Sequence, residues 1–189
     1  MAYKDWHHYQ ESTLNDEVNK LIYYFDNIKL NNVVDLGCGA GNESVYMLKR
    51  GLNVTSIDRQ IDKAFFYNRL NDEEKSRLNL IESSFEEVNI PKSDLLMAFF
   101  SIPFCNPKNF DELWNKIYSS INDNGYFVGE LFGNRDAWKD KDEINTFTKE
   151  KVLEYLKNYK IIKFDEVEFI RESDNKKWHY FDIIAQKRR

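Results

Sequence analysis

The sequence is poor in glycine, proline and cysteine, and each scarcity excludes a class of protein. With 7 Gly and 3 Pro among 189 residues, the chain is neither collagen-like nor of low complexity. Two cysteines, Cys38 and Cys105, cannot form a disulfide framework, and no cysteine–histidine group has the spacing of a zinc site, so we predict no metal centre. No run approaches the roughly 20 apolar residues of a membrane-spanning helix, and the first residues lack the apolar core of a secretory signal. We therefore expect a cytoplasmic protein with no membrane partner.

The residues that are abundant indicate a folded chain with a sizeable core. Aromatic residues make up 15% of the sequence, with 14 Phe, 11 Tyr and 4 Trp, which disordered chains lack. The formal net charge is −5, which disfavours a protein whose affinity comes mainly from phosphate backbones. We see neither an internal repeat nor a linker, and we predict a single domain over residues 1–189, with an N-terminal helix region over 1–30. The oligomeric state stays open.

Strand-like and helix-like segments alternate along the chain, which predicts an α/β fold with a mostly parallel sheet. Apolar runs predict strands over 32–36, 53–57, 78–82, 94–100 and 126–131. Helical periodicity predicts helices over 16–28, 42–50, 62–70, 108–121 and 148–158. The segments 161–170 and 178–185 predict a C-terminal antiparallel hairpin, and the charged stretch 133–145 predicts an exposed loop or mobile insert.

The most informative segment is V-V-D-L-G-C-G-A-G-N-E-S at residues 33–44, in which a strand enters a glycine turn and a helix leaves it. Glycine permits positive φ and removes the Cβ that would keep a ligand from the backbone. Asp58 ends the next strand, where a carboxylate can accept hydrogen bonds from both hydroxyls of a ribose. Together these features predict a site for a nucleoside cofactor.

The spacing of the glycines narrows the kind of cofactor. The turn is G-x-G-x-G rather than the dinucleotide pattern G-x-G-x-x-G, and Glu43 at the helix start would repel a pyrophosphate. No Walker lysine follows, which excludes a P-loop. A cofactor with a nucleoside, no phosphate and a cationic centre fits better, and a nicotinamide oxidoreductase is disfavoured.

The motif D-L-G-C-G-x-G followed by a strand-end Asp resembles class I S-adenosylmethionine-dependent methyltransferases. The segments 94–104, 129–138 and 177–180 resemble the small bacterial methyltransferases grouped with tellurite-resistance proteins. The resemblance spans essentially the whole chain. It implies a Rossmann-like, doubly wound, mostly parallel seven-stranded sheet with a C-terminal antiparallel hairpin, and S-adenosyl-L-methionine as the cofactor.

The resemblance also implies a role for each matching residue in cofactor binding. Gly37, Gly39 and Gly41 line the methionine and ribose parts, and Asp35 helps to hold the amino group. Asp58 binds the ribose hydroxyls, with Arg59 beside the adenine. The remaining positions frame the adenine edge (Ser84, Phe85 and Glu86), lie near the transferring methyl (Phe99 and Ser101) or close over the cofactor as a lid (Tyr9).

The acceptor side carries fewer signals. His179, between Trp178 and Tyr180, is a candidate for orienting the acceptor or taking a proton, and a satisfied histidine at the sheet edge is the alternative. Arg135 is a candidate for binding an anionic acceptor, and a solvated loop charge is the alternative. The strand over 94–100 lacks the Asn-Pro-Pro-Tyr signature of amide methylation at its end. This favours a small-molecule acceptor such as a thiol or a chalcogen oxyanion.

Two other functions remain open at this point. A non-catalytic module that binds S-adenosylmethionine would have the same glycine turn and the same Asp58. Methylation of RNA or protein would need a basic surface beside the site, which the net charge does not promise.

Overall fold

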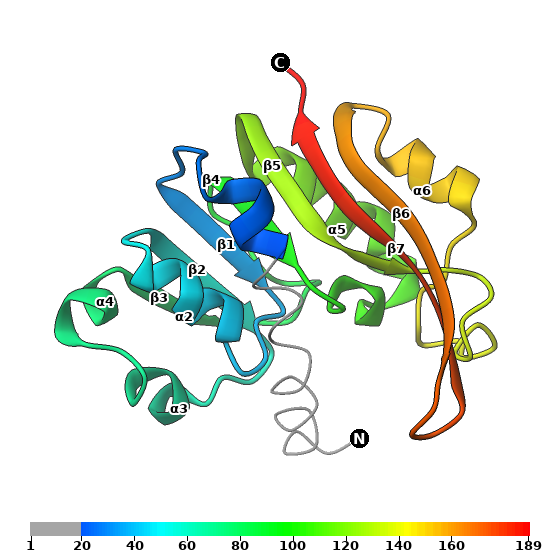
Figure 1. Cartoon of the computed structure of the whole chain (residues 1–189), viewed down its shortest axis with the longest axis horizontal. Helices are drawn as coiled ribbons and strands as arrows, with labels where there is room; N and C mark the ends of the chain where they lie inside the picture. The colour runs from blue at the N-terminus through cyan, green and yellow to red at the C-terminus, as the bar shows by residue number, and fades with distance from the viewer. Residues whose placement is uncertain (1–19) are drawn as a thin grey trace.

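The computed structural model describes residues 20–189, so Tyr9 and the first part of the predicted N-terminal helix lie outside the described residues. Seven strands form one sheet in the order β3-β2-β1-β4-β5-β7-β6 (Figure 1). Strands β1 to β5 pair parallel with one another, and β7 pairs antiparallel with both β5 and β6. The predicted fold class is confirmed. The strands are β1 Asn32–Leu36, β2 Asn53–Asp58, β3 Leu78–Glu82, β4 Ser93–Ala98, β5 Ile121–Phe132, β6 Tyr159–Arg171 and β7 Lys176–Lys187.

The helices connect the strands, and most of them begin or end within a few residues of the predicted bounds. Residues 20–25 are helical. The labelled helices are α2 Asn42–Lys49, α3 Lys63–Tyr67, α4 Asp72–Ser76, α5 Phe110–Ser120 and α6 Lys149–Tyr155, with short 3-10 turns η1 Ile102–Phe104 and η2 Pro107–Asn109. The predicted helix over 62–70 is wrong in its length, and α4 was not predicted. It begins because Asn71 and Glu74 form a reciprocal capping box.

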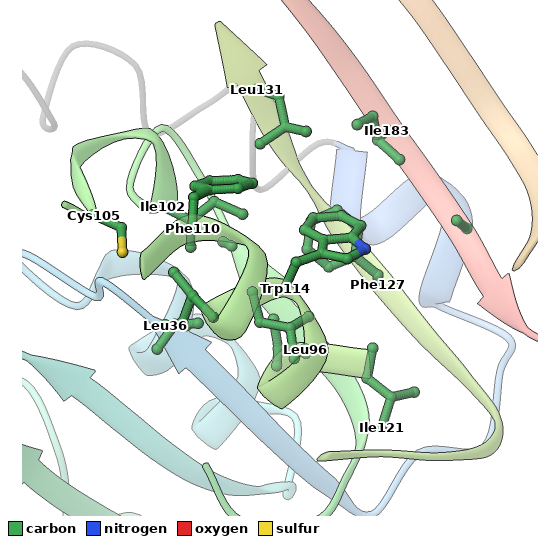
Figure 2. Packing of buried hydrophobic residues seen from close by; sticks show 14 of the residues in the cluster. Leu36, Leu96, Ile102, Cys105, Phe110, Trp114, Ile121, Phe127, Leu131 and Ile183 are labelled. Atoms are coloured by element: carbon green, nitrogen blue, oxygen red, sulfur yellow. The ribbon is translucent and has the colours of Figure 1, made fainter. Parts of the chain in front are cut away.

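Both faces of the sheet are covered by apolar side chains. On one face, α5 packs the indole of Trp114 and the ring of Phe110 against Leu96 and Phe127 (Figure 2). On the other face, Leu21 and α2 cover a second cluster. The residues of β4 alternate between the two clusters, as its unbroken apolar sequence predicts for a strand buried on both sides. Among residues 20–189, no helix has the length and hydropathy needed to cross a membrane.

The C-terminal hairpin is longer than the apolar pattern predicts. Its register runs from Tyr159 opposite Lys187 to Arg171 opposite Lys176. The last residues of β6 are exposed, with Ile170 at 61%, so these positions are held by backbone pairing rather than by burial. Hydrophobic alternation reports burial, which explains why it underestimates a ribbon of this kind.

The charged loop after β5 is exposed at most of its charged positions, as expected, but it is anchored rather than a free insert. Gly133 forms a β-bridge with Phe147 at its base. The side chain of Asn145 donates hydrogen bonds of 3.0 and 2.6 Å to the carbonyls of Pro103 and Cys105. Asp136 is also buried. Burial of these polar anchors places the loop against the turn that follows β4.

Candidate active site

The glycine turn lies between the end of β1 and the start of α2, at the edge where the parallel strands end. Gly37, Gly39 and Gly41 all have positive φ, of 80°, 49° and 72°. A Cβ at Gly37 would lie 2.3 Å from the Cβ of Ser101, and one at Gly41 would lie 2.0 Å from the ring of Phe66. At Gly37 and Gly41 only glycine satisfies both the backbone conformation and the space, so these two residues are fixed by local geometry.

Asp58 closes the turn from the neighbouring strand. Its Oδ2 accepts a hydrogen bond of 2.9 Å from the backbone amide of Gly39. Its Oδ1 makes only a longer contact, of 3.4 Å, with the amide of Gln60. One oxygen therefore shapes the turn while the other keeps capacity to accept hydrogen bonds. Arg59, which follows, is exposed.

A second acidic residue stands beside Asp58 and was not predicted. Glu82 ends β3 and is the register partner of Asp58. Its Oε1 accepts a hydrogen bond of 3.1 Å from the amide of Ile61. The signal was present in the sequence, because parallel strands end at one edge and the predicted strand 78–82 ends on this carboxylate.

Asp35 is the buried acid of the site. It is 2% exposed, and its Oδ2 accepts a hydrogen bond of 2.6 Å from the hydroxyl of Ser44, which lies 2.7 Å from the hydroxyl of Ser56. Burial raises the pKa of Asp35 to about 7 despite the bond from Ser44, and the charge of Asp58 adds to the shift. A cationic group brought next to Asp35 would favour its ionised form.

The turn after β3 holds the three residues predicted to frame the adenine edge. The ring of Phe85 approaches to within 3.2 Å of where a Cβ on Gly37 would stand. The hydroxyl of Ser84 accepts a bond of 3.3 Å from the amide of Glu87. Glu86 accepts a bond of 2.9 Å from the amide of Asn106, which is the main reason why its pKa is lowered. Phe85 thus lies at the glycine turn, whereas Glu86 braces the segment after η1.

The turn after β4 brings Phe99 and Ser101 to the same edge. The hydroxyl of Ser101 donates a hydrogen bond of 2.6 Å to the carbonyl of Leu36 at the end of β1. Between these residues, Phe100 has a positive φ of 46°, a strained conformation for a side chain of its size. Its amide donates a bond of 3.2 Å to Oε2 of Glu130.

Glu130 belongs to a buried ionic group that the sequence analysis missed. It is 0% exposed, and its Oε1 lies 2.6 Å from the ammonium of Lys20. The same ammonium lies 2.8 Å from Asp182 on β7, whose second oxygen pairs with Lys163. A single glutamate within the apolar run of a predicted strand was the signal that pointed to such a partner.

His179 and Arg135, the two acceptor-side candidates, lie together. The imidazole is 0% exposed, its Nδ1 accepts a bond of 3.0 Å from the amide of Arg135, and its Nε2 lies 3.1 Å from Oε1 of Glu166. The guanidinium of Arg135 pairs with Glu166 and Glu168, each at 2.7 Å. Both side chains already have strong partners in this arrangement.

The sequence matches one family profile and several curated proteins. The family profile described as "Tellurite resistance protein TehB" matches residues 3–177. A curated relative from Haemophilus influenzae (strain 10810), "Probable S-adenosyl-L-methionine-dependent methyltransferase TehB", is 24% identical over 136 residues, covering 71% of this chain and 48% of the relative. "Carboxy-S-adenosyl-L-methionine synthase" from Campylobacter concisus is 28% identical over 132 residues, covering 68% and 52%. The chain thus spans about half the length of the curated relatives it matches.

Solved structures show the same fold. TehB from Haemophilus influenzae has a TM-score of 0.73 at 19% identity, covering 90% of this chain and 62% of that one. The 1,6-didemethyltoxoflavin-N1-methyltransferase of Burkholderia thailandensis, with 1,6-didemethyltoxoflavin and S-adenosylhomocysteine bound, has a TM-score of 0.73 at 17% identity, covering 99% and 84%.

Proposed function

The chain belongs to the family of the tellurite resistance protein TehB, and from that membership we propose that it transfers the methyl group of S-adenosyl-L-methionine to a small-molecule acceptor. The observation that carries the proposal is the glycine turn held by Asp58, with its bond of 2.9 Å to the amide of Gly39. A curated relative that binds this cofactor by name, and a neighbour with its demethylated product bound, support the choice of cofactor.

The described residues suit this cofactor. Gly37 has no Cβ, and because a Cβ there would stand 2.3 Å from that of Ser101, the glycine lets the turn after β4 pack directly against the glycine turn. Oδ1 of Asp58 has capacity for the ribose hydroxyls, and the buried carboxyl of Asp35 is placed to pair with the amino group of the methionine part. Phe85 beside the turn offers a flat surface near the adenine. Tyr9, proposed as a lid, lies outside the described residues.

The cofactor supplies an electrophilic methyl on a sulfonium, and its leaving group is neutral. The protein therefore needs mainly to align the reactants and exclude water. Phe99 and Ser101 shape the turn near the methyl, and Ser101 is fixed by its bond to Leu36. A thiolate or a chalcogen oxyanion needs no strong general base, in keeping with a site built from aromatic and paired groups.

For the acceptor side we propose positioning roles for His179 and Arg135. The imidazole of His179 holds the amide of Arg135, and both side chains engage Glu166 on β6. Direct action on the acceptor would require each to leave these partners. Together they fix the start of the loop after β5, and this loop reaches the turn after β4 through Asn145.

The cofactor assignment is tested by calorimetry with S-adenosylmethionine, S-adenosylhomocysteine and NAD. We expect micromolar binding of the first two and none of NAD. A screen of tellurite, selenite, thiols, halides and small amines, read by formation of S-adenosylhomocysteine, then tests turnover. Binding without turnover on any acceptor would favour a non-catalytic module, and turnover on RNA or protein alone would contradict the small-molecule acceptor.

A further inference from the structure

Aromatic side chains from several segments form a continuous layer beside the turn after β4. We call this layer the aromatic wall, and its members are Phe100, Phe104, Phe132, Trp138, Trp178 and Tyr180. Ring centroids of contacting pairs lie between 5.0 Å, for Phe100 and Tyr180, and 6.2 Å, for Phe100 and Phe132. Most pairs are edge-to-face, the arrangement in which aromatic contacts are favourable.

The aromatic wall has a buried base and a half-exposed rim. Phe132 and Trp178 are 1% and 5% exposed, respectively. The other four rings, those of Phe100, Phe104, Trp138 and Tyr180, are half-buried. Phe100 stands between Phe99 and Ser101, so the rim begins where the methyl donor is expected to end. The wall is thus continuous with the proposed active site.

A lysine inside the wall holds two of the rings in place. The ammonium of Lys176 lies 3.1 Å from the ring centroid of Trp138 and 3.6 Å from that of Trp178. It is buried, makes no hydrogen bond and lies 3.8 Å from Oδ1 of the buried Asp136. Cation–π attraction on both sides fixes the two indoles relative to each other. The rings of Trp138 and Trp178 are therefore held in position before any ligand binds.

Phe100 is held in a conformation that is costly. A non-glycine residue with a φ of 46° is strained, and this conformation persists only where its surroundings enforce it. Glu130 accepts a hydrogen bond from the amide of Phe100. The ring of Phe100 contacts the rings of Phe132, Trp178 and Tyr180. Strain of this kind is concentrated at sites that hold a ligand.

Three basic groups near the wall are already engaged, whereas Lys141, with its ammonium 5.5 Å from the ring centroid of Trp138, is exposed. The ammonium of Lys20 bridges Glu130 and Asp182 at 2.6 and 2.8 Å. The guanidinium of Arg135 pairs with two glutamates, and Lys176 is enclosed by rings. A hydrated oxyanion that paired with Lys20, Arg135 or Lys176 would have to break one of these arrangements, whereas a flat ring would pack on the half-exposed rings.

Resting on the proposed function, we propose that the methyl acceptor carries a planar aromatic or heteroaromatic ring, which packs on Phe100, Phe104 and Tyr180 of the aromatic wall. The ring presents a thiolate sulfur or a nitrogen to the methyl group. Its lone pair forms the new bond to carbon while the bond from carbon to the sulfonium breaks, and that electron pair stays on sulfur in S-adenosylhomocysteine. A nitrogen that carries a proton releases it to water.

The test compares acceptors that share a thiol and differ in the ring. The full chain is given S-adenosylmethionine with 2-mercaptopyridine, cyclohexanethiol or tellurite, and binding of the same compounds in the presence of S-adenosylhomocysteine is measured by calorimetry. We expect the aromatic thiol to bind about tenfold more tightly than the saturated one, with the lower KM. Equal affinities, or binding and methylation of tellurite alone, would overturn the proposal.

A pair of variants locates the ring. Phe104→Leu should weaken binding of 2-mercaptopyridine about fivefold and leave the affinity for S-adenosylhomocysteine unchanged. Phe164→Leu is the control, because Phe164 stacks on Phe181, which belongs to the core cluster of Phe110 and Trp114 and not to the aromatic wall. Equal effects of the two substitutions would contradict the placement. Failure of S-adenosylmethionine to bind, measured without any acceptor, would instead count against the proposed function.

Discussion

Gly37 lies so close to Ser101 that a Cβ on residue 37 would stand 2.3 Å from the Cβ and 2.8 Å from the hydroxyl oxygen of Ser101. Gly37→Ala must therefore move the turn after β4, and it also places an alanine at a φ of 80°. We expect a loss of at least about 2 kcal/mol in the free energy of unfolding, together with loss of cofactor binding. Urea unfolding and calorimetry measure the two effects.

Gly51→Ala is the matched control for this substitution. Gly51 has a φ of 86°, but a Cβ there would meet nothing within 4 Å. Only the backbone strain remains, so we expect a loss of about 1–2 kcal/mol and unchanged cofactor affinity. Equal cofactor affinities in the two variants would show that the crowding at Gly37 has no bearing on the cofactor.

Asp58→Ala should weaken binding of S-adenosylmethionine by about 1–3 kcal/mol, through loss of charged hydrogen bonds to the ribose. The variant also loses the acceptor for the Gly39 amide, so its unfolding temperature is measured alongside. Asp26→Ala, which removes the partner of Arg50, serves as the control and should bind the cofactor normally. If Asp58→Ala binds as well as the unchanged chain, the assignment of Asp58 fails.

Asp35 predicts a dependence of stability on pH. Because its pKa is about 7 in the folded chain, against an ordinary value of 3.8, the folded chain keeps a proton there that the unfolded chain loses. Its contribution to the free energy of unfolding therefore falls as pH rises between about 4 and 7, by at most about 1.4 kcal/mol per pH unit, and is constant above.

Asp35→Asn removes this titration. Relative to the unchanged chain, the variant should gain stability as the pH rises from about 4 to 7, as measured by urea unfolding. It should also bind S-adenosylmethionine more weakly at the higher pH, because it has no carboxylate for the amino group. A constant difference in stability across this range would mean that Asp35 titrates alike in both states.

Lys20→Met removes the cation that lies between two acidic residues. The carboxylate of Glu130 is fully buried, so it would lose its ion pair without gaining water. We expect a loss of about 3 kcal/mol in the free energy of unfolding, partly restored in the double variant Lys20→Met/Glu130→Gln. Lys75→Met, at an exposed pair with Asp72, should change stability by less than about 0.5 kcal/mol. If the effects of the two substitutions add in the double variant, Lys20 and Glu130 are not energetically coupled.

His179→Gln separates a positioning role from proton transfer. A positioning role predicts a lower unfolding temperature, unchanged affinity for S-adenosylmethionine and a KM for the acceptor that rises more than kcat falls, because the Arg135 amide loses its partner. A fall in kcat of about 100-fold at constant KM would show instead that the imidazole takes a proton from the acceptor.

Much of the fold follows from patterns that report burial. Apolar runs predicted the five parallel strands and the final hairpin, and the glycine turn and the strand-end Asp58 could be read directly from the sequence. The capping signal at Asn71 and Glu74 was present in the sequence but passed over, and it accounts for α4.

The rest of the site depends on contacts between distant segments. Lys176 on β7 lies against the ring of Trp138, which belongs to a loop some forty residues earlier in the chain. The pair of Lys20 and Glu130 spans 110 residues. Local patterns carry no information on such partners. A charged residue in an apolar strand shows only that a partner exists.

The order of strands also sets the order of assembly during synthesis. β6 leaves the ribosome before β7, yet among the strands of residues 20–189 it pairs only with β7, which lies between it and β5 in the sheet. Until β7 emerges, β6 has no place to dock, and the ring of Phe164, which stacks on Phe181 of β7 in the folded chain, faces water. A nascent chain that pauses in this interval would be a natural client for a chaperone that recognises extended apolar segments.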